Sequence, residues 1–228
     1  MARGVSRDFG PAVAAEAVGT ALLVAIVIGS GIFAQRLSPH DVGVQLLENS
    51  TATGAGLVAL IMTFGDVSGA HFNPVVSMVE RVRGRHSTRE TAGYIGAQFV
   101  GGAIGAVIAN LMFGLAAVNL STHTRSSAAL WLGEVVATFG LVVVVVGVSR
   151  SGRPDRAAIA VGGYIAAAYW FTSSTSFANP AVTLARTLSN SFAGIRPSSA
   201  PMFMLCEVVG GAVAAGFAFY VFRVSERD

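Results

Sequence analysis

Two short stretches decide the fold of this chain: HFNPVVSMVER at residues 71–81 and FANPAVTLAR at residues 177–186. Each places Asn-Pro in apolar surroundings. Asparagine is favoured just before a helix because its side chain accepts from the first free backbone N–H groups, and proline fits the first helical position because it has no N–H. Each pair therefore predicts a helix. Both helices end after about ten residues, roughly 15 Å, or half the thickness of a bilayer.

The rest of the chain is predicted to lie in a lipid bilayer. Of the 228 residues, 53% are hydrophobic and only 12% are charged, which is too apolar for a soluble globule. Six apolar stretches approach the length that crosses about 30 Å of hydrocarbon. They lie at 11–33, 50–67, 92–118, 128–149, 157–172 and 201–222. The sequence therefore predicts an all-α membrane protein with six transmembrane helices and two re-entrant half-helices.

The basic residues, all of them arginine, predict the orientation. If the N-terminus is cytoplasmic, most of them fall on the cytoplasmic side, in agreement with the positive-inside rule. These are Arg3, Arg7, Arg81, Arg83, Arg85, Arg89, Arg150, Arg153, Arg156, Arg223 and Arg227. Only Arg36, Arg125 and Arg196 fall in loops on the other side, and Arg186 lies in the second short helix. We therefore expect a protein of the inner (plasma) membrane with both termini cytoplasmic, and no nucleic-acid partner.

The two halves of the sequence resemble each other. Glu16 in AAEAVGTALLVAIV corresponds to Glu134 in LGEVVATFGLVVVV, and GAQFVGGAIGAV at 96–107 corresponds to LCEVVGGAVAAG at 205–216. The Asn-Pro pairs fall at matching places between these elements. Each half, approximately 9–118 and 127–223, thus contains three crossings. An odd number of crossings turns the second half upside down, so the sequence predicts an inverted repeat.

The inverted repeat brings the two half-helices together, N-terminus to N-terminus, near the midplane. Irregular backbone at that depth is tolerated only inside protein or along a water-filled cavity. We therefore expect the segments before Asn73 and Asn179 to line a path with carbonyl acceptors, two amide donors and two positive helix ends. Such a path passes neutral hydrogen-bonding molecules and opposes cations. A single membrane channel domain over 1–228 follows.

SGAHFNPVV and SFANPAVT, with the two glutamates and the repeat order, resemble the aquaporin and aquaglyceroporin (major intrinsic protein) family over nearly the whole chain. The resemblance implies a homotetramer with one pore per subunit, in contact with membrane lipid. It implies a central constriction at Asn73, Pro74, Val75, Asn179, Pro180 and Ala181. It also implies carbonyls presented to the solute by Gly69, Ala70, His71, Thr175, Ser176 and Phe177. Glu16 and Glu134 would brace the re-entrant segments.

The chain departs from the family's pattern at the outer constriction. The family usually has an arginine directly after the second Asn-Pro-Ala, and here that residue is Val182. The family's spacing gives Thr53, Ala167 and Ser176 as the other three positions. All four are small, which predicts a pore wider than that of a water-only channel. A shift of one or two residues would instead place Ala168 or Tyr169 there, and a tyrosine would narrow the pore.

The arginine-free pattern resembles bacterial aquaglyceroporins associated with arsenic resistance, which implies glycerol, water and neutral trihydroxy solutes such as arsenite or antimonite as substrates. Arg186, one helical turn beyond Val182, either partly replaces the missing cation or pairs with an acid or a loop carbonyl. Cys206 is the only cysteine, so no Cys-rich metal site and no thiol capture of arsenic is expected, and no cofactor is predicted.

Three other functions stay open at this point. The protein could be mainly a water channel with an unusual filter. A coupled secondary transporter also uses inverted repeats and broken helices, but it would be expected to carry ion-binding carboxylates at the midplane, where this chain has asparagines. An enzyme is disfavoured, because the sequence contains no Ser/His/Asp set, no HExxH and no Gly-Lys phosphate loop.

Overall fold

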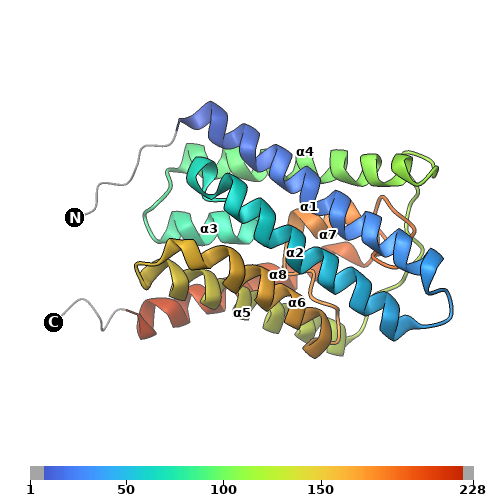
Figure 1. Cartoon of the computed structure of the whole chain (residues 1–228). Coiled ribbons are helices and arrows are strands. Elements are labelled where there is room, and N and C mark those ends of the chain that lie inside the picture. Colours follow the sequence, from blue (N-terminus) through green and yellow to red (C-terminus); the bar gives the residue numbers. More distant parts are fainter. Residues whose placement is uncertain (1–7, 223–228) are drawn as a thin grey trace.

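The computed structural model describes residues 8–222, and these form a bundle of helices (Figure 1). In chain order the helices are α1 (Phe9–Leu37), α2 (Val42–Ser68), α3 (Pro74–Val82), α4 (Thr88–Met112), α5 (Ala128–Arg150), α6 (Ala157–Phe171), α7 (Pro180–Arg186) and α8 (Ala200–Val221), with a 3₁₀ turn at Pro154–Arg156. The predicted all-α class is confirmed. Four arginines used to predict the orientation lie outside the described residues: Arg3, Arg7, Arg223 and Arg227.

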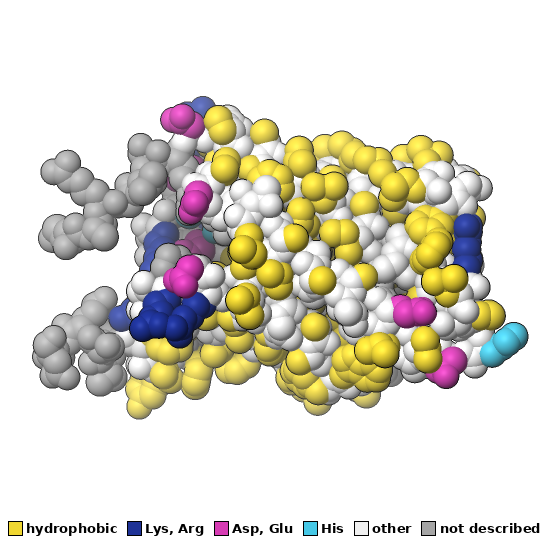
Figure 2. Space-filling model, viewed as in Figure 1, with side chains coloured by type: hydrophobic (Ala, Val, Ile, Leu, Met, Phe, Trp, Pro, Cys, Tyr) yellow, Lys and Arg dark blue, Asp and Glu magenta, His cyan; other side chains and the backbone are white. Residues whose placement is uncertain are grey.

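Within residues 8–222, five helices are long and apolar enough to cross a membrane: α1, α2, α4, α5 and α8. Helix α6 has only 15 residues, about 22 Å at 1.5 Å per residue, because the backbone becomes extended at Thr172. The sixth predicted crossing is therefore a helix shorter than the other five. Apolar side chains cover the middle of the molecular face in Figure 2, and charged side chains gather toward its two ends.

The two short helices begin as predicted. Asn73 precedes α3 and its side-chain oxygen accepts from the Val75 N–H at 2.9 Å. Asn179 precedes α7 and accepts from the N–H groups of Ala181 and Val182 at 3.1 and 3.3 Å. Helix α3 has nine residues and α7 has seven. From the middle of the bundle, α3 extends toward the end where α1 begins and α8 stops, and α7 extends toward the opposite end (Figure 1).

Close helix contacts repeat in the two halves because glycine removes the side chain at the crossing. A Cβ on Gly101 of α4 would lie 2.1 Å from the Ala17 carbonyl oxygen of α1. A Cβ on Gly210 of α8 would lie 2.4 Å from the Val135 carbonyl oxygen of α5. Each long helix after a half-helix therefore packs directly on the backbone of the first helix of its own half.

The neighbouring glycines make contacts between the halves. A Cβ on Gly102 of α4 would lie 3.2 Å from the Ala181 carbonyl oxygen of α7. A Cβ on Gly211 of α8 would lie 2.2 Å from Val75 Cγ1 of α3. Each re-entrant helix is thus seated against a long helix of the opposite half.

Candidate solute pathway

Two reciprocal hydrogen bonds join the tips of the half-helices. Asn73 Nδ2 donates to the Ala178 carbonyl at 2.7 Å, and Asn179 Nδ2 donates to the Phe72 carbonyl at 2.7 Å. The side-chain oxygen of each asparagine caps its own helix, so both amides are held in one orientation. An amide nitrogen carries two hydrogens, and each asparagine therefore keeps one N–H beyond the bond to the opposite segment.

The backbones before the two asparagines have the same unusual conformation. Residues four, three and one positions before each asparagine have positive φ, a region that non-glycine residues rarely adopt. These are Gly69 (93°), Ala70 (50°) and Phe72 (49°) in the first half, and Thr175 (63°), Ser176 (48°) and Ala178 (51°) in the second. Strain of this kind persists only where surrounding contacts hold the backbone in place.

Glu16 of α1 supplies those contacts in the first half. Its carboxylate accepts from Ser68 Oγ at 2.6 Å, the His71 N–H at 2.9 Å, the Phe72 N–H at 2.7 Å and Gln98 Nε2 at 2.8 Å. All four partners act as donors, and an ionised carboxylate is the form that only accepts. Because the N–H groups of the segment are turned toward Glu16, its carbonyls are free to face elsewhere.

Glu134 of α5 does the same in the second half. It accepts from the Phe177 N–H at 3.0 Å, the Ala178 N–H at 2.8 Å and the Ser174 side chain. Ser174 stands five residues before Asn179, just as Ser68 stands five residues before Asn73. The two re-entrant segments are therefore held by equivalent residues on equivalent atoms.

The halves differ at one buried position. Gln98 donates to Glu16 in the first half, whereas Glu207 of α8 occupies the corresponding place in the second. Glu207 is fully buried and accepts from Thr183 Oγ1 at 2.5 Å. Its carboxyl group also lies close to the Asn179 backbone and to the Glu134 carboxyl group. The first half therefore places an amide beside its bracing glutamate, and the second half places a carboxyl group there.

The structure brings three of the four predicted outer positions into the interior and leaves Ala167 out. Ala167 lies on the exposed face of α6, which also carries Ile159 and Trp170. The side chain from α6 that meets Thr53 belongs to Tyr169, with its hydroxyl 3.2 Å from Thr53 Oγ1. The family's spacing therefore gave the wrong residue, and the alternative two positions later is the one that approaches Thr53.

Ser176 and Val182 complete this buried set. Thr53, Tyr169 and Ser176 are each 2% exposed and Val182 is 4% exposed, so all four side chains are buried. The predicted set of four small side chains is wrong at one position, because Tyr169 lies beside Thr53 where Ala167 was expected. Ser176 Oγ has no hydrogen-bond partner within residues 8–222. The buried set thus contains three hydroxyl groups and one apolar side chain, with the Thr53 and Tyr169 hydroxyls in contact.

Arg186 is held against the second re-entrant segment and the loop after α7. Its side chain is 2% exposed, its Nε donates to the Ala193 carbonyl, and its guanidinium lies over the Phe177 ring with Cζ 3.3 Å from the ring centroid. Of the alternatives left open by the sequence, the loop-carbonyl partner is the one observed.

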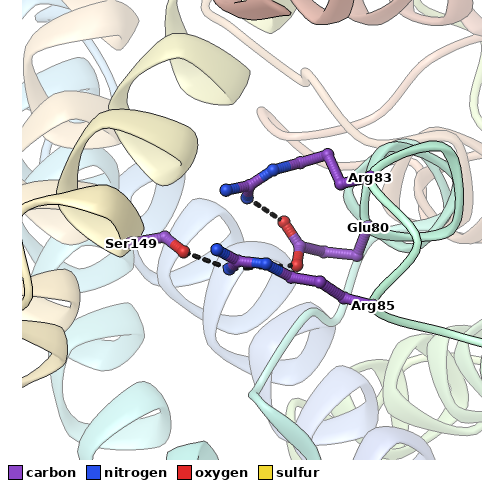
Figure 3. Close-up of polar contacts among 4 residues, drawn as sticks. All are labelled: Glu80, Arg83, Arg85 and Ser149. Carbon is purple, nitrogen blue, oxygen red and sulfur yellow. Dashed lines mark hydrogen bonds and ion pairs between the residues drawn. The ribbon is translucent and has the colours of Figure 1, made fainter. Parts of the chain in front are cut away.

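At the other end of the bundle, an ionic cluster ties the segment after α3 to α5 (Figure 3). Glu80 accepts from Arg83 at 2.5 Å and from Arg85 at 3.5 Å, and Arg85 also contacts Ser149 of α5. Burial lowers the pKa of the Arg83 guanidinium, and the nearby Glu80 carboxylate opposes this shift. On the same half-helix, Ser77 Oγ lies 3.0 Å from His71 Nδ1.

A membrane-spanning bundle in which two half-helices meet tip to tip between braced, strained segments has the architecture of a membrane channel. The chain belongs to the major intrinsic protein family, whose model it matches over residues 4–176. It is a channel for water and small solutes.

Similar proteins cover most of the chain. Aquaglyceroporin AqpS of Rhizobium meliloti is 49% identical over 200 residues, which are 88% of this chain and 85% of that protein. The probable aquaporin AqpM of Archaeoglobus fulgidus is 29% identical over 235 residues, covering 91% and 95%. The X-ray structure of the aquaglyceroporin from Plasmodium falciparum superposes with a TM-score of 0.73 at 17% identity, over 94% of this chain and 97% of that one, and supports the fold.

Two residues of the site went unnoticed in the sequence. Glu207 has the same position in its motif as Gln98 has in the first half. The difference between an acid and an amide at matching positions could have pointed to this residue. Arg125, whose guanidinium donates to the carbonyls of Gly194, Phe192 and Ser174, was counted only as one of the few arginines on the outer side. Nothing in the sequence pattern indicated the carbonyls that its side chain reaches.

Proposed function

We propose that the protein is a passive channel for water and small neutral polyhydroxy solutes, with glycerol and the trihydroxy arsenite or antimonite molecules as the substrate class. The observation that carries this proposal is the outer group of Thr53, Tyr169, Ser176 and Val182. Three hydroxyls offer donors and acceptors on the way through, while Val182 faces the carbon or metalloid side of the solute. A relative at 49% identity is named an aquaglyceroporin, which agrees with this class.

At the centre, Asn73 and Asn179 each offer their remaining N–H to the passing molecule. Pro74, Val75, Pro180 and Ala181 form the tips of the helices behind these donors. The carbonyls of Gly69, Ala70, His71, Thr175, Ser176 and Phe177 offer acceptors along the way, and Glu16 and Glu134 keep the N–H groups of both segments turned away from the path. Helix N-termini at the centre carry partial positive charge, which opposes cations.

A water channel with an unusual filter is the second candidate, and it is favoured by the Tyr169 ring beside Thr53, which is larger than the predicted Ala167. Tyr169→Ala separates the two functions. If trihydroxy solutes pass the wild type, stopped-flow measurements in liposomes should show glycerol and arsenite permeability above empty vesicles, and Tyr169→Ala should raise glycerol permeability more than water permeability. Wild-type protein that passes water but neither glycerol nor arsenite would exclude the solute class proposed here.

We further infer a homotetramer in the inner membrane, with both termini in the cytoplasm. Cys206 is the only cysteine, so Cys206→Ser gives a background in which one new cysteine near either terminus can be labelled from one side of the membrane. Labelling of both termini from outside intact cells would reverse the orientation. The mass of the detergent-solubilised protein, relative to the 23.4 kDa chain, tests the tetramer.

A further inference from the structure

The segment between α4 and α5 is tied to the outer end of the second half. Asn119 N–H donates to the Leu188 carbonyl at 2.9 Å, and Ser121 N–H donates to the Thr187 carbonyl at 2.9 Å. The Arg196 N–H returns a bond to the His123 carbonyl at 2.7 Å. These bonds fix the backbone on either side of His123 and bring the next basic residue, Arg125, over the re-entrant segment.

The guanidinium of Arg125 is held by three backbone carbonyls. Nε donates to Gly194 at 2.9 Å, Nη2 to Phe192 at 3.2 Å and Nη1 to Ser174 at 3.5 Å. Carbonyl oxygens orient a cation without cancelling its charge. Burial lowers the pKa of Arg125, while Glu134 and Tyr169 oppose the shift, so both groups lie within electrostatic range of the guanidinium.

Arg125 and Arg186 approach the same aromatic ring but differ in their surroundings. Arg125 Cζ lies 5.1 Å from the Phe177 centroid and Arg186 Cζ lies 3.3 Å from it. Arg186 interacts electrostatically with both Glu134 and Glu207, so its charge has two acids nearby. Arg125 interacts electrostatically with Glu134 and Tyr169, and its carbonyl partners include Ser174, two residues before Ser176.

We propose that Arg125 supplies the fixed positive charge of the outer constriction that Val182 cannot supply, and that it is a specificity-determining residue against cations. The inference rests on the proposed solute pathway. A charge held in a low-dielectric site acts over several ångströms, so Arg125 need not touch the solute to raise the barrier for a cation. Ser176 Oγ, buried and without a partner in the described chain, marks where a neutral solute would bond beneath it.

The alternative role for Arg125 is purely structural: its hydrogen bonds would hold three loop segments together, and its charge would not affect permeation. The charge role and the structural role are separated by two substitutions. Arg125→Lys keeps the charge but loses the planar fork that bonds several carbonyls at once, whereas Arg125→Gln keeps polarity and loses the charge. Arg196→Gln removes an exposed arginine from the same end of the molecule and serves as the matched control.

The measurements are proton and sodium conductance, together with water and glycerol permeability, in liposomes with equal amounts of each protein. We expect Arg125→Gln to raise cation conductance about tenfold or more at retained water permeability, and Arg125→Lys and Arg196→Gln to stay within about twofold of wild type. Unchanged conductance in Arg125→Gln with water flux retained would overturn the proposal. So would equal leaks in Arg125→Lys and Arg125→Gln, since the structural role would then explain both.

A second variant keeps the test decisive if Arg125→Gln folds poorly. The double variant Val182→Arg with Arg125→Gln places a cation at position 182 instead. Its cation conductance should return to the wild-type level, and a persistent leak in the folded double variant would refute the charge role. Failure of the proposed function is distinguishable, because wild-type protein would then show no glycerol or arsenite permeability whatever its cation conductance.

Discussion

Replacing Glu134 with glutamine tests how strongly the second re-entrant segment depends on one carboxylate. In the wild type, each oxygen of Glu134 faces a backbone N–H, that of Phe177 at 3.0 Å and that of Ala178 at 2.8 Å. A glutamine side chain has one accepting oxygen and one donating NH₂ group. Whichever way the amide turns, one buried backbone N–H faces another donor.

The expected cost follows from that count. A buried donor left without an acceptor costs about 1–3 kcal/mol, which changes the equilibrium between a held and a released segment by about 5- to 150-fold. The released segment can relieve the positive φ angles of Thr175, Ser176 and Ala178, so nothing intrinsic to the backbone opposes its release. Because Asn179 follows directly, its amide loses its orientation, and solute flux should fall with stability.

The control is Glu207→Gln. Its new NH₂ group can donate to Glu134 as Gln98 Nε2 donates to Glu16, and its oxygen can still accept from Thr183. We therefore expect near wild-type flux and melting temperature for Glu207→Gln.

The assays are stopped-flow water and glycerol permeability and the melting temperature in detergent, followed by tryptophan fluorescence. Trp131 is well placed as a reporter, because it packs against the buried cluster that contains Phe177. Wild-type flux and melting temperature in Glu134→Gln would refute the bracing role. Equal losses in Glu134→Gln and Glu207→Gln would contradict the argument that an amide can replace the second carboxyl.

Three further outcomes follow from the geometry. Val182→Arg should lower the ratio of glycerol to water permeability, because the long side chain takes room from the larger solute while water still exchanges hydrogen bonds; a ratio that does not drop would remove Val182 from the constriction. Asn179→Asp loses the donor to the opposite segment, and its negative charge offsets the partial positive charge of the helix end, so cation conductance should rise. Unchanged conductance in a mutant that still passes solute would count against the central site. Glu80→Ala leaves Arg83 and Arg85 without their acid and should destabilise the protein by about 1–2 kcal/mol, with partial exposure limiting the loss, as a lower melting temperature would show.

The sequence predicted those parts of the fold that depend on local chemistry. Asn-Pro starts a helix because of the hydrogen-bonding groups of two adjacent residues, and the structure has both helices where they were expected. Helix α6 was harder to predict, since the apolar run continues past the point where the backbone becomes extended. The position in α6 was counted back from Asn179 across this irregular segment, where the number of residues per unit of length is not fixed. An error of two residues in that count gives Ala167 in place of Tyr169.

Long-range polar contacts were the other unpredictable part. Arg125 and Ser174 lie 49 residues apart and meet only through the folding of two loops, and no local pattern encodes that contact. Every residue has a backbone carbonyl, so the residue type does not show which carbonyl accepts a hydrogen bond. A side chain that bonds only to carbonyls therefore cannot be matched to its partners from one sequence.

The seating of each half-helix in the opposite half sets an order for assembly. Helix α3 rests on Gly211 of α8, and Asn73 donates to the Ala178 carbonyl just before α7, so both partners are made after the whole first half. Until α7 and α8 enter the membrane, the first re-entrant segment has Glu16 to hold it but neither its helix seat nor its partner asparagine. The first half therefore cannot reach its final packing while it emerges from the ribosome, and a chain stopped before α8 leaves the earlier half unfinished as well.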